Sequence, residues 1–393
     1  MLSLAAGPER VNDACLGIHG ADDFMETMCH KESEEYPGID GKPKSGMIFT
    51  GLDNLGVLRK ALSDNTTIKN ADDVGASVVI PERDEKGVLV TMSDDMVDKL
   101  EKLKNAYRYA GALKKNQEPP IEYLEDFEEV QKTFRAPSSV IAHPFNLISK
   151  MKEVIADPEL ATGASFYQIV EGQEETARKV IEEFNAKKIK EERKYVSADL
   201  LNSGLVTEKN IKSDDDGSDE EKVRGYEVSV EAALIGSEIR IESTDFKTQN
   251  TFEEIAAKHG LDLDVHDSPK LAAMIENFKD EMAHPRGMID EDTKSPIVKQ
   301  IIFCDMLGLH SKIRRLLQKR CGISAGKIVI VTGQTNNTPE EIQAVQDGFN
   351  AQGEENRYQV VLANEKAEVG INLQKGTQAI HHLTIGWTPD SIE

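Results

Sequence analysis

The chain has 393 residues, of which 39% are hydrophobic and 30% charged, a composition typical of a globular protein with two or three domains. Its formal net charge of −23 excludes a protein that coats nucleic acid with its whole surface, so any such contact must be confined to a groove. No apolar run reaches the length of a membrane span, and four cysteines in this length favour a reducing, cytoplasmic compartment.

The first 116 residues carry a mixed pattern of helix and strand signals. Residues 52–62 have helical spacing, and the apolar runs 77–81 (SVVIP) and 87–92 (GVLVTM) favour strands. Ser93 is placed to cap a following helix, whose apolar face has the spacing of Met96, Leu100, Leu103, Tyr107 and Tyr109. No metal site is expected, because the cysteines and histidines of this part match no standard zinc spacing.

Residues 117–267 are strongly charged and favour helices. Pro144 disfavours helix at His143 and predicts a break there, and residues 176–195 form a Lys/Glu-rich pattern typical of a solvated helix. An acidic loop follows at 213–222, without the spacing of a calcium-binding EF-hand loop, and residues 226–241 are compatible with a hairpin. We therefore expect a largely helical region with an acidic surface loop.

From residue 268 onward, apolar strands alternate with amphipathic helices. Strands are predicted over 298–304, 327–332 and 358–363, and helices over 269–282, 309–319 and 339–349. A turn at 370–373 precedes one more strand. This alternation predicts an α/β fold with a parallel sheet and helices on both faces.

Polar or turn-forming segments follow three of these strands, at 304–306, 332–334 and 364–366. Ligands of open parallel sheets bind beyond the carboxyl ends of the strands, so these segments predict a binding edge. The helix over 309–319 also has a basic face, which suits either a solvated surface or a contact with phosphates.

Four blocks in this part carry a family resemblance. Residues 298–317 are similar to motif IV of superfamily 2 helicases of the Swi/Snf-related kind, and residues 328–350, ending in Asp-Gly-Phe-Asn, to the block that follows it. Residues 362–373 resemble motif V with its "GxNL" core, and Trp-Thr-Pro at 387–389 resembles the "WNP" before motif VI. Their order and spacing resemble the second RecA-like lobe of that family.

The resemblance implies three parts. Residues 1–116 would be the tail of a first RecA-like lobe, 117–267 a helical insertion, and 268–393 the second lobe, truncated before motif VI. The phrases GMIFTGLDNLGVLRK and AIHHLTIGWTPDS are most like the helicase part of phage and mobile-element helicase–methylase proteins of the defence-against-restriction kind. Residues 161–264 resemble no family.

The resemblance also implies site residues. It places Glu368, Gly370 and Asn372 of motif V at an ATP cleft; the alternative for each residue is ordinary turn chemistry. Contacts with the nucleic-acid backbone would come from strand ends and from the start of the basic helix, namely from His310, Lys312, Thr332, Gly333, Gln334, Asn364 and Lys366.

The expected function is that of a motor lobe in an ATP-dependent DNA helicase or translocase. The sequence contains neither a GxxxxGK[ST] phosphate loop nor the arginine-finger motif, so we expect no ATP hydrolysis by this chain alone. The resemblance implies that ATP and Mg²⁺ bind with the first-lobe and motif VI segments of a longer protein, and that a methyltransferase domain belongs to the same protein. The alternative is a non-catalytic module that binds nucleic acid or protein.

Overall fold

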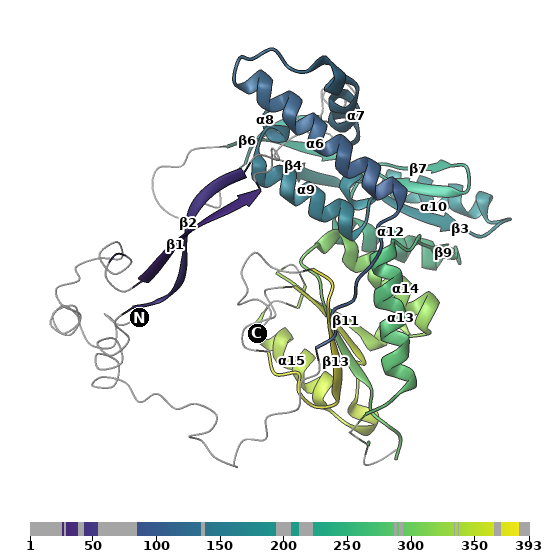
Figure 1. Ribbon diagram of the computed structural model, residues 1–393. Helices are drawn as coiled ribbons and strands as arrows, with labels where there is room; N and C mark the ends of the chain where they lie inside the picture. The colour runs from purple at the N-terminus through teal and green to yellow at the C-terminus, as the bar shows by residue number, and fades with distance from the viewer. Residues whose placement is uncertain are drawn as a thin grey trace. The chain divides into compact units, whose positions relative to one another are not determined.

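The computed structural model describes residues 26, 29–37, 43–53, 85–134, 138–193, 206–211, 223–286, 289–290, 294–333, 335–336, 338–364 and 371–384. The chain divides into two compact units, Met1–Gly87 and Val88–Glu393 (Figure 1). In the first unit, β1 (Cys29–Pro37) pairs antiparallel with β2 (Pro43–Leu52). The predicted helix 52–62 and strand 77–81 fall largely or wholly outside the described residues, and the predicted boundaries at 116 and 267 lie within the second unit.

The strand predicted over residues 87–92 is wrong. These residues have no regular secondary structure, and Leu89 is fully exposed at 101%. An apolar run becomes a strand only where a neighbouring strand accepts its backbone hydrogen bonds, and none of the described segments pairs with this one.

A helical layer follows. It consists of α6 (Asp94–Lys114), α7 (Leu124–Phe134), α8 (Ser138–Ile141) and α9 (Pro144–Ala156). The predicted cap is confirmed, because the Ser93 hydroxyl accepts from the Met96 amide at 3.4 Å. The predicted break is confirmed as well, since α8 ends before His143 and Pro144 opens α9. Apolar side chains of α6, α7 and α9 form a separate small core.

Residues 157–267, here called the mixed region, contain more strand than the sequence indicated. Their helices are α10 (Glu174–Ala186) and α12 (Phe246–Lys258). Their strands are β3 (Ser165–Ile169), β4 (Lys190–Arg193), β5 (Val206–Ile211), β6 (Val223–Ser229), β7 (Ala232–Ile235), β8 (Glu238–Ile241) and β9 (Leu263–Asp264). They form two antiparallel sheets, ordered β7-β8-β3-β9 and β4-β6-β5.

Two predictions in the mixed region need correction. The helix predicted over 176–195 stops at Ala186, because the chain then turns into β4, and its supposedly solvated pattern buries Ala177, Val180 and Phe184 completely. The hairpin within 226–241 is β7–β8 alone, whereas β6 pairs with strands of the other sheet.

Residues 268–384, here called the sheet lobe, confirm the predicted α/β fold. The elements are α13 (Pro269–Ala283), β10 (Lys299–Phe303), α14 (His310–Cys321), β11 (Ile328–Val331), α15 (Pro339–Asn350), β12 (Val360–Ala363) and β13 (Thr377–His382). The four strands pair parallel in the order β11-β12-β10-β13.

Both faces of this sheet are covered. Alternate residues of a strand point to opposite faces, so Ile302 and Leu362 pack with α13 and α14, while Ile301 and Val361 pack with α15. Figure 1 shows α13 and α14 on one side of the strands and α15 on the other. Of the helices that the structure describes, none is long and apolar enough to cross a membrane.

Candidate functional site at the carboxyl edge of the parallel sheet

Each strand of the sheet lobe is followed by a polar residue at the same edge. Phe303 of β10 is level with Ala363 of β12, which is level with Val331 of β11, and β13 ends beside Phe303 at His382. Asp305, Thr332, Asn364 and Thr384 therefore lie just beyond aligned strand ends. The sequence predicted this edge as the place for a ligand.

A cleft of about 450 Å³ opens at this edge and is closed on its other side by α9. The sheet lobe contributes Asp305, Asn364 and Thr384, and α9 contributes Lys150, Lys152 and Glu153. The Lys150 ammonium lies 2.6 Å from a Glu153 carboxylate oxygen. Two cations thus balance two carboxylates, so the cleft suits a polar ligand held by hydrogen bonds more than by net charge.

The sheet edge is internally braced. The Asp305 amide donates to the Thr384 hydroxyl at 2.8 Å, and that hydroxyl donates to the Asp305 carboxylate at 3.2 Å, which joins the ends of β10 and β13. The Asn364 amide donates to the Val331 carbonyl at 3.4 Å. The side-chain oxygen of Asn364 is buried and has no hydrogen-bond donor among the residues that the structure describes.

Thr332 and Gly333, both predicted to contact phosphates, form a tight turn after β11. The Thr332 side chain is 4% exposed and lies 3.0 Å from the Thr335 hydroxyl, and the two backbones bond each other in both directions. Only Gly333 is exposed in this pair. Gln334, the third member of the predicted segment, lies outside the described residues.

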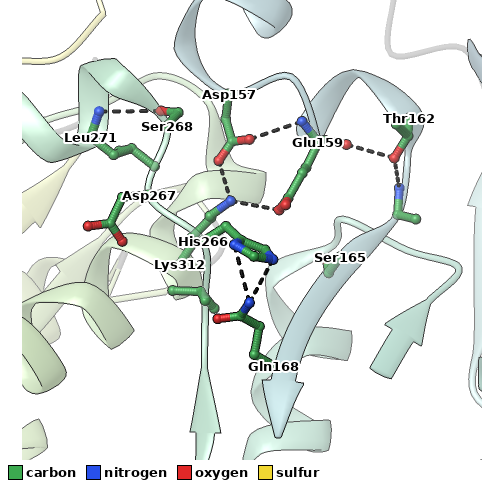
Figure 2. A network of polar contacts seen from close by, with 12 residues as sticks. Asp157, Glu159, Thr162, Ser165, Gln168, His266, Asp267, Ser268, Leu271 and Lys312 are labelled. Atoms are coloured by element: carbon green, nitrogen blue, oxygen red, sulfur yellow. Dashed lines mark hydrogen bonds and ion pairs between the residues drawn. The ribbon is translucent and has the colours of Figure 1, made fainter. Parts of the chain in front are cut away.

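His310 and Lys312 start α14, but their side chains point to internal partners. His310 is fully buried and its Nε2–H donates to the Cys304 carbonyl at 2.7 Å; burial lowers the pKa of this imidazole. The Lys312 ammonium lies 2.5 Å from Asp157 and 2.7 Å from Glu159, as Figure 2 shows. Burial alone would lower the pKa of Lys312, but these carboxylates outweigh it and the pKa is raised. We therefore leave both residues out of the proposed contact surface.

Asn372, predicted at an ATP cleft, lies away from this edge. Its carbonyl accepts from the Asn350 side-chain amide at 2.6 Å, at the last residue of α15. Because α15 runs back from the carboxyl edge, its end lies near the starts of the strands. The Asn372 side chain accepts from the Gln374 amide at 3.4 Å, which is turn chemistry. Lys366, Glu368 and Gly370 lie outside the described residues.

Sequence reasoning missed the α9 lysines and Thr384 as site residues. Asp305 had a signal, because it follows a buried strand, but Lys150 and Lys152 have none: only the tertiary fold brings α9 to the sheet. Within the described ranges, no group of three or more histidine, cysteine or acidic side chains is arranged to hold a metal ion.

The sequence is similar to the Defense against restriction protein B of Escherichia phage P1, with 26% identity over 428 aligned positions. The alignment covers 96% of this chain but 17% of the length of that relative. Comparison with known protein families finds no match, and no solved structure matches the chain. The relation to a phage antirestriction protein agrees with the resemblance drawn from the sequence.

Proposed function

We propose that this chain supplies the second motor lobe of an ATP-dependent DNA helicase or translocase that serves a phage defence against restriction. The observation that carries the proposal is the parallel sheet β11-β12-β10-β13, whose carboxyl edge brings Asp305, from the segment that resembles motif IV, to the same cleft as Asn364, from the start of the segment that resembles motif V. These two segments are far apart in sequence but border the same cleft, which supports a ligand that contacts both.

The two resembling blocks around α15 also contact each other. The Asn350 side chain donates to the Asn372 carbonyl and accepts from the Lys375 amide at 3.1 Å, which fixes the "GxNL" segment against the end of α15. Gly348 packs against the Tyr358 ring, which would lie 3.0 Å from an added Cβ. These contacts support a structural basis for the Gly-Phe-Asn and "GxNL" patterns that the family resemblance depends on.

The cleft offers groups that bind a phosphodiester backbone. Lysine ammonium groups and side-chain amides are usual partners of phosphate oxygens, and Lys150, Lys152 and Asn364 provide them in the cleft, whereas the Thr384 hydroxyl already donates to Asp305. Phosphoryl transfer depends mainly on positioning and charge neutralisation, so ATP would need further segments that supply the phosphate loop and Mg²⁺ ligands. In this proposal the lobe grips DNA and closes on ATP held elsewhere.

ATP hydrolysis tests the motor. We would compare this chain with the complete protein encoded by its gene, with and without duplex DNA. We expect DNA-stimulated hydrolysis by the complete protein and none by the chain alone. A complete protein that binds DNA without hydrolysing ATP would favour the alternative, a binding module built on the same lobe; the charge balance of the cleft is compatible with that alternative.

DNA affinity tests the cleft. Replacing Lys150 and Lys152 by Gln removes at most two phosphate contacts, so affinity should fall and the slope of log affinity against log salt should decrease in magnitude by at most about 1.8. The control replaces Lys179 and Lys279, which lie outside the cleft on α10 and α13, by Gln and should leave both affinity and slope unchanged. Equal affinities and slopes for the two double variants would exclude the cleft as the DNA contact.

A further inference from the structure

The cations of α14 are all engaged by acidic residues of the mixed region. Lys312 pairs with Asp157 and Glu159, and Arg314 and Arg315 pair with Glu253 at 2.8 and 3.0 Å. At the other end of the helix, Lys319 pairs with Asp262, and Arg320 with Asp264 at 2.9 Å. The basic face that suggested a nucleic-acid contact is therefore matched, cation by cation, from within the chain.

Glu253 is the centre of this seam between α12 and α14. Its side chain is 7% exposed and accepts from the Ser311 hydroxyl at 2.5 Å and the Tyr167 hydroxyl at 3.1 Å, besides its two guanidinium partners. A carboxylate this buried is tolerated because four donors replace its hydration. Separating α12 from α14 would remove both guanidinium groups and the Ser311 hydroxyl from Glu253, and of these four donors only the Tyr167 hydroxyl of β3 would remain.

Apolar packing continues across the same seam. Phe252 and Ile255 of α12 belong to one core with Ile313 and Leu317 of α14, and this core extends into the parallel sheet. A polar contact and close packing add to it. The Gln249 side-chain amide donates to the Gly308 carbonyl at 3.1 Å, and a Cβ at Gly308 would lie 3.1 Å from Thr244. The seam is built like a domain interior and not like an interface that opens.

We infer that the mixed region and the sheet lobe form one rigid body. The mixed region would then move together with the sheet lobe, as a lever attached to it. The cations of α14 would remain paired within the chain, so this helix would not contact nucleic acid. The rigid body follows from the contacts alone, whereas the lever movement rests on the proposed motor function. A movement of the sheet lobe would thus displace the two antiparallel sheets of the mixed region by the same rotation.

Hydrogen exchange of the full chain tests the rigid body. Glu253→Gln should speed exchange at least tenfold in α12 and, to a similar extent, in α14 and β10. The matched control is Glu254→Gln, one residue along the same helix and exposed, which should change neither. Faster exchange in α12 with α14 and β10 unchanged would overturn the inference, because the two regions would then open independently.

Two further measurements keep the test decisive. If Glu253→Gln does not fold, hydrogen exchange of the wild-type chain is measured in increasing urea. The opening free energies of amides in α12, α14 and β10 should then converge on a single value, and separate values for α12 and for α14 with β10 would overturn the inference. Addition of duplex DNA should leave exchange in α12 and α14 unchanged, whereas protection of α14 would overturn its closure to nucleic acid. A chain that binds no DNA at all would count against the proposed function, and the urea experiment would still decide the rigid body.

Discussion

Replacement of Lys312 by Met tests the polar network that joins the mixed region to α14. Methionine keeps most of the aliphatic stem of lysine but removes the ammonium that lies between Asp157 and Glu159 (Figure 2). The substitution therefore changes charge with little change in packing. Its effect on the free energy of unfolding measures what the buried cation contributes.

The expected loss follows from the burial of the partners. The Asp157 side chain is 2% exposed and Lys312 itself 11%, so water cannot replace the ammonium, and Asp157 remains beside the carboxylate of Glu159. Removing one partner of a buried ion pair costs about 3–5 kcal/mol. Glu159 is 27% exposed and is partly screened, so we expect the lower end, about 3 kcal/mol.

The pH dependence gives the sign of the effect. Burial raises the pKa of Glu159, and Lys312 lowers it, so loss of the lysine raises this pKa further. A carboxyl whose folded pKa exceeds its unfolded value binds more protons when folded, so the variant gains stability as pH falls toward its unfolded pKa. The difference between wild type and variant should therefore narrow on acidification from pH 7.

Urea unfolding at several pH values measures both effects. Lys279→Met, at an exposed pair on α13, is the control and should leave the free energy of unfolding close to that of the wild type. The double change Lys312→Met with Asp157→Asn should recover part of the loss, because the amide oxygen still accepts from the Glu159 backbone. A single variant as stable as the control, or a double variant no better than the single, would refute the reasoning.

Three further predictions concern the sheet lobe. Gly376→Ala should lower the melting temperature more than Gly260→Ala, because both glycines have positive φ but only at Gly376 would a Cβ meet Ile297, at 2.7 Å; equal shifts would contradict the clash. The pKa of His310 is lowered in the folded chain, so the unfolded chain takes up the proton first and the wild type should lose stability as pH falls below about 6.5. His310→Gln should reduce this loss, and identical curves of unfolding free energy against pH for wild type and variant would argue against it. Asn350→Ala should speed hydrogen exchange of the Lys375 amide, with the Gln343 region of α15 as internal reference.

The sheet lobe was predictable because its signals are local. Strands of a parallel sheet are buried on both faces, so they form continuous apolar runs such as residues 301–303 and 328–331. The helix predicted over 339–349 is α15 to within one residue, and its start carries a capping box between Thr338 and Glu341. Such elements can be predicted from their own residues, without knowledge of the segments that pack against them.

The mixed region was less predictable because its strands depend on distant partners. β4 is Lys-Glu-Glu-Arg, with no apolar alternation, and it exists because β6 pairs with it. Residues 87–92 show the converse: they have every local feature of a strand, but no described segment pairs with them. A segment with strand propensity forms a strand only if another segment pairs with it, and a single sequence does not show which segments pair.

The basic face of α14 explains why the site residues were harder to predict than the fold. A row of lysines and arginines has the same spacing whether its partners are phosphates, water or carboxylates of the same chain, and the acidic partners here come from residues up to 155 positions away, as Asp157 and Lys312 illustrate. Burial separates these cases: a cation kept for a ligand must remain reachable, whereas Lys312 is 11% exposed. The sequence thus identifies the charges of α14, but only the fold identifies their partners. Because those partners are carboxylates of the same chain, we propose the DNA contact at the cleft beside α9 and not at α14.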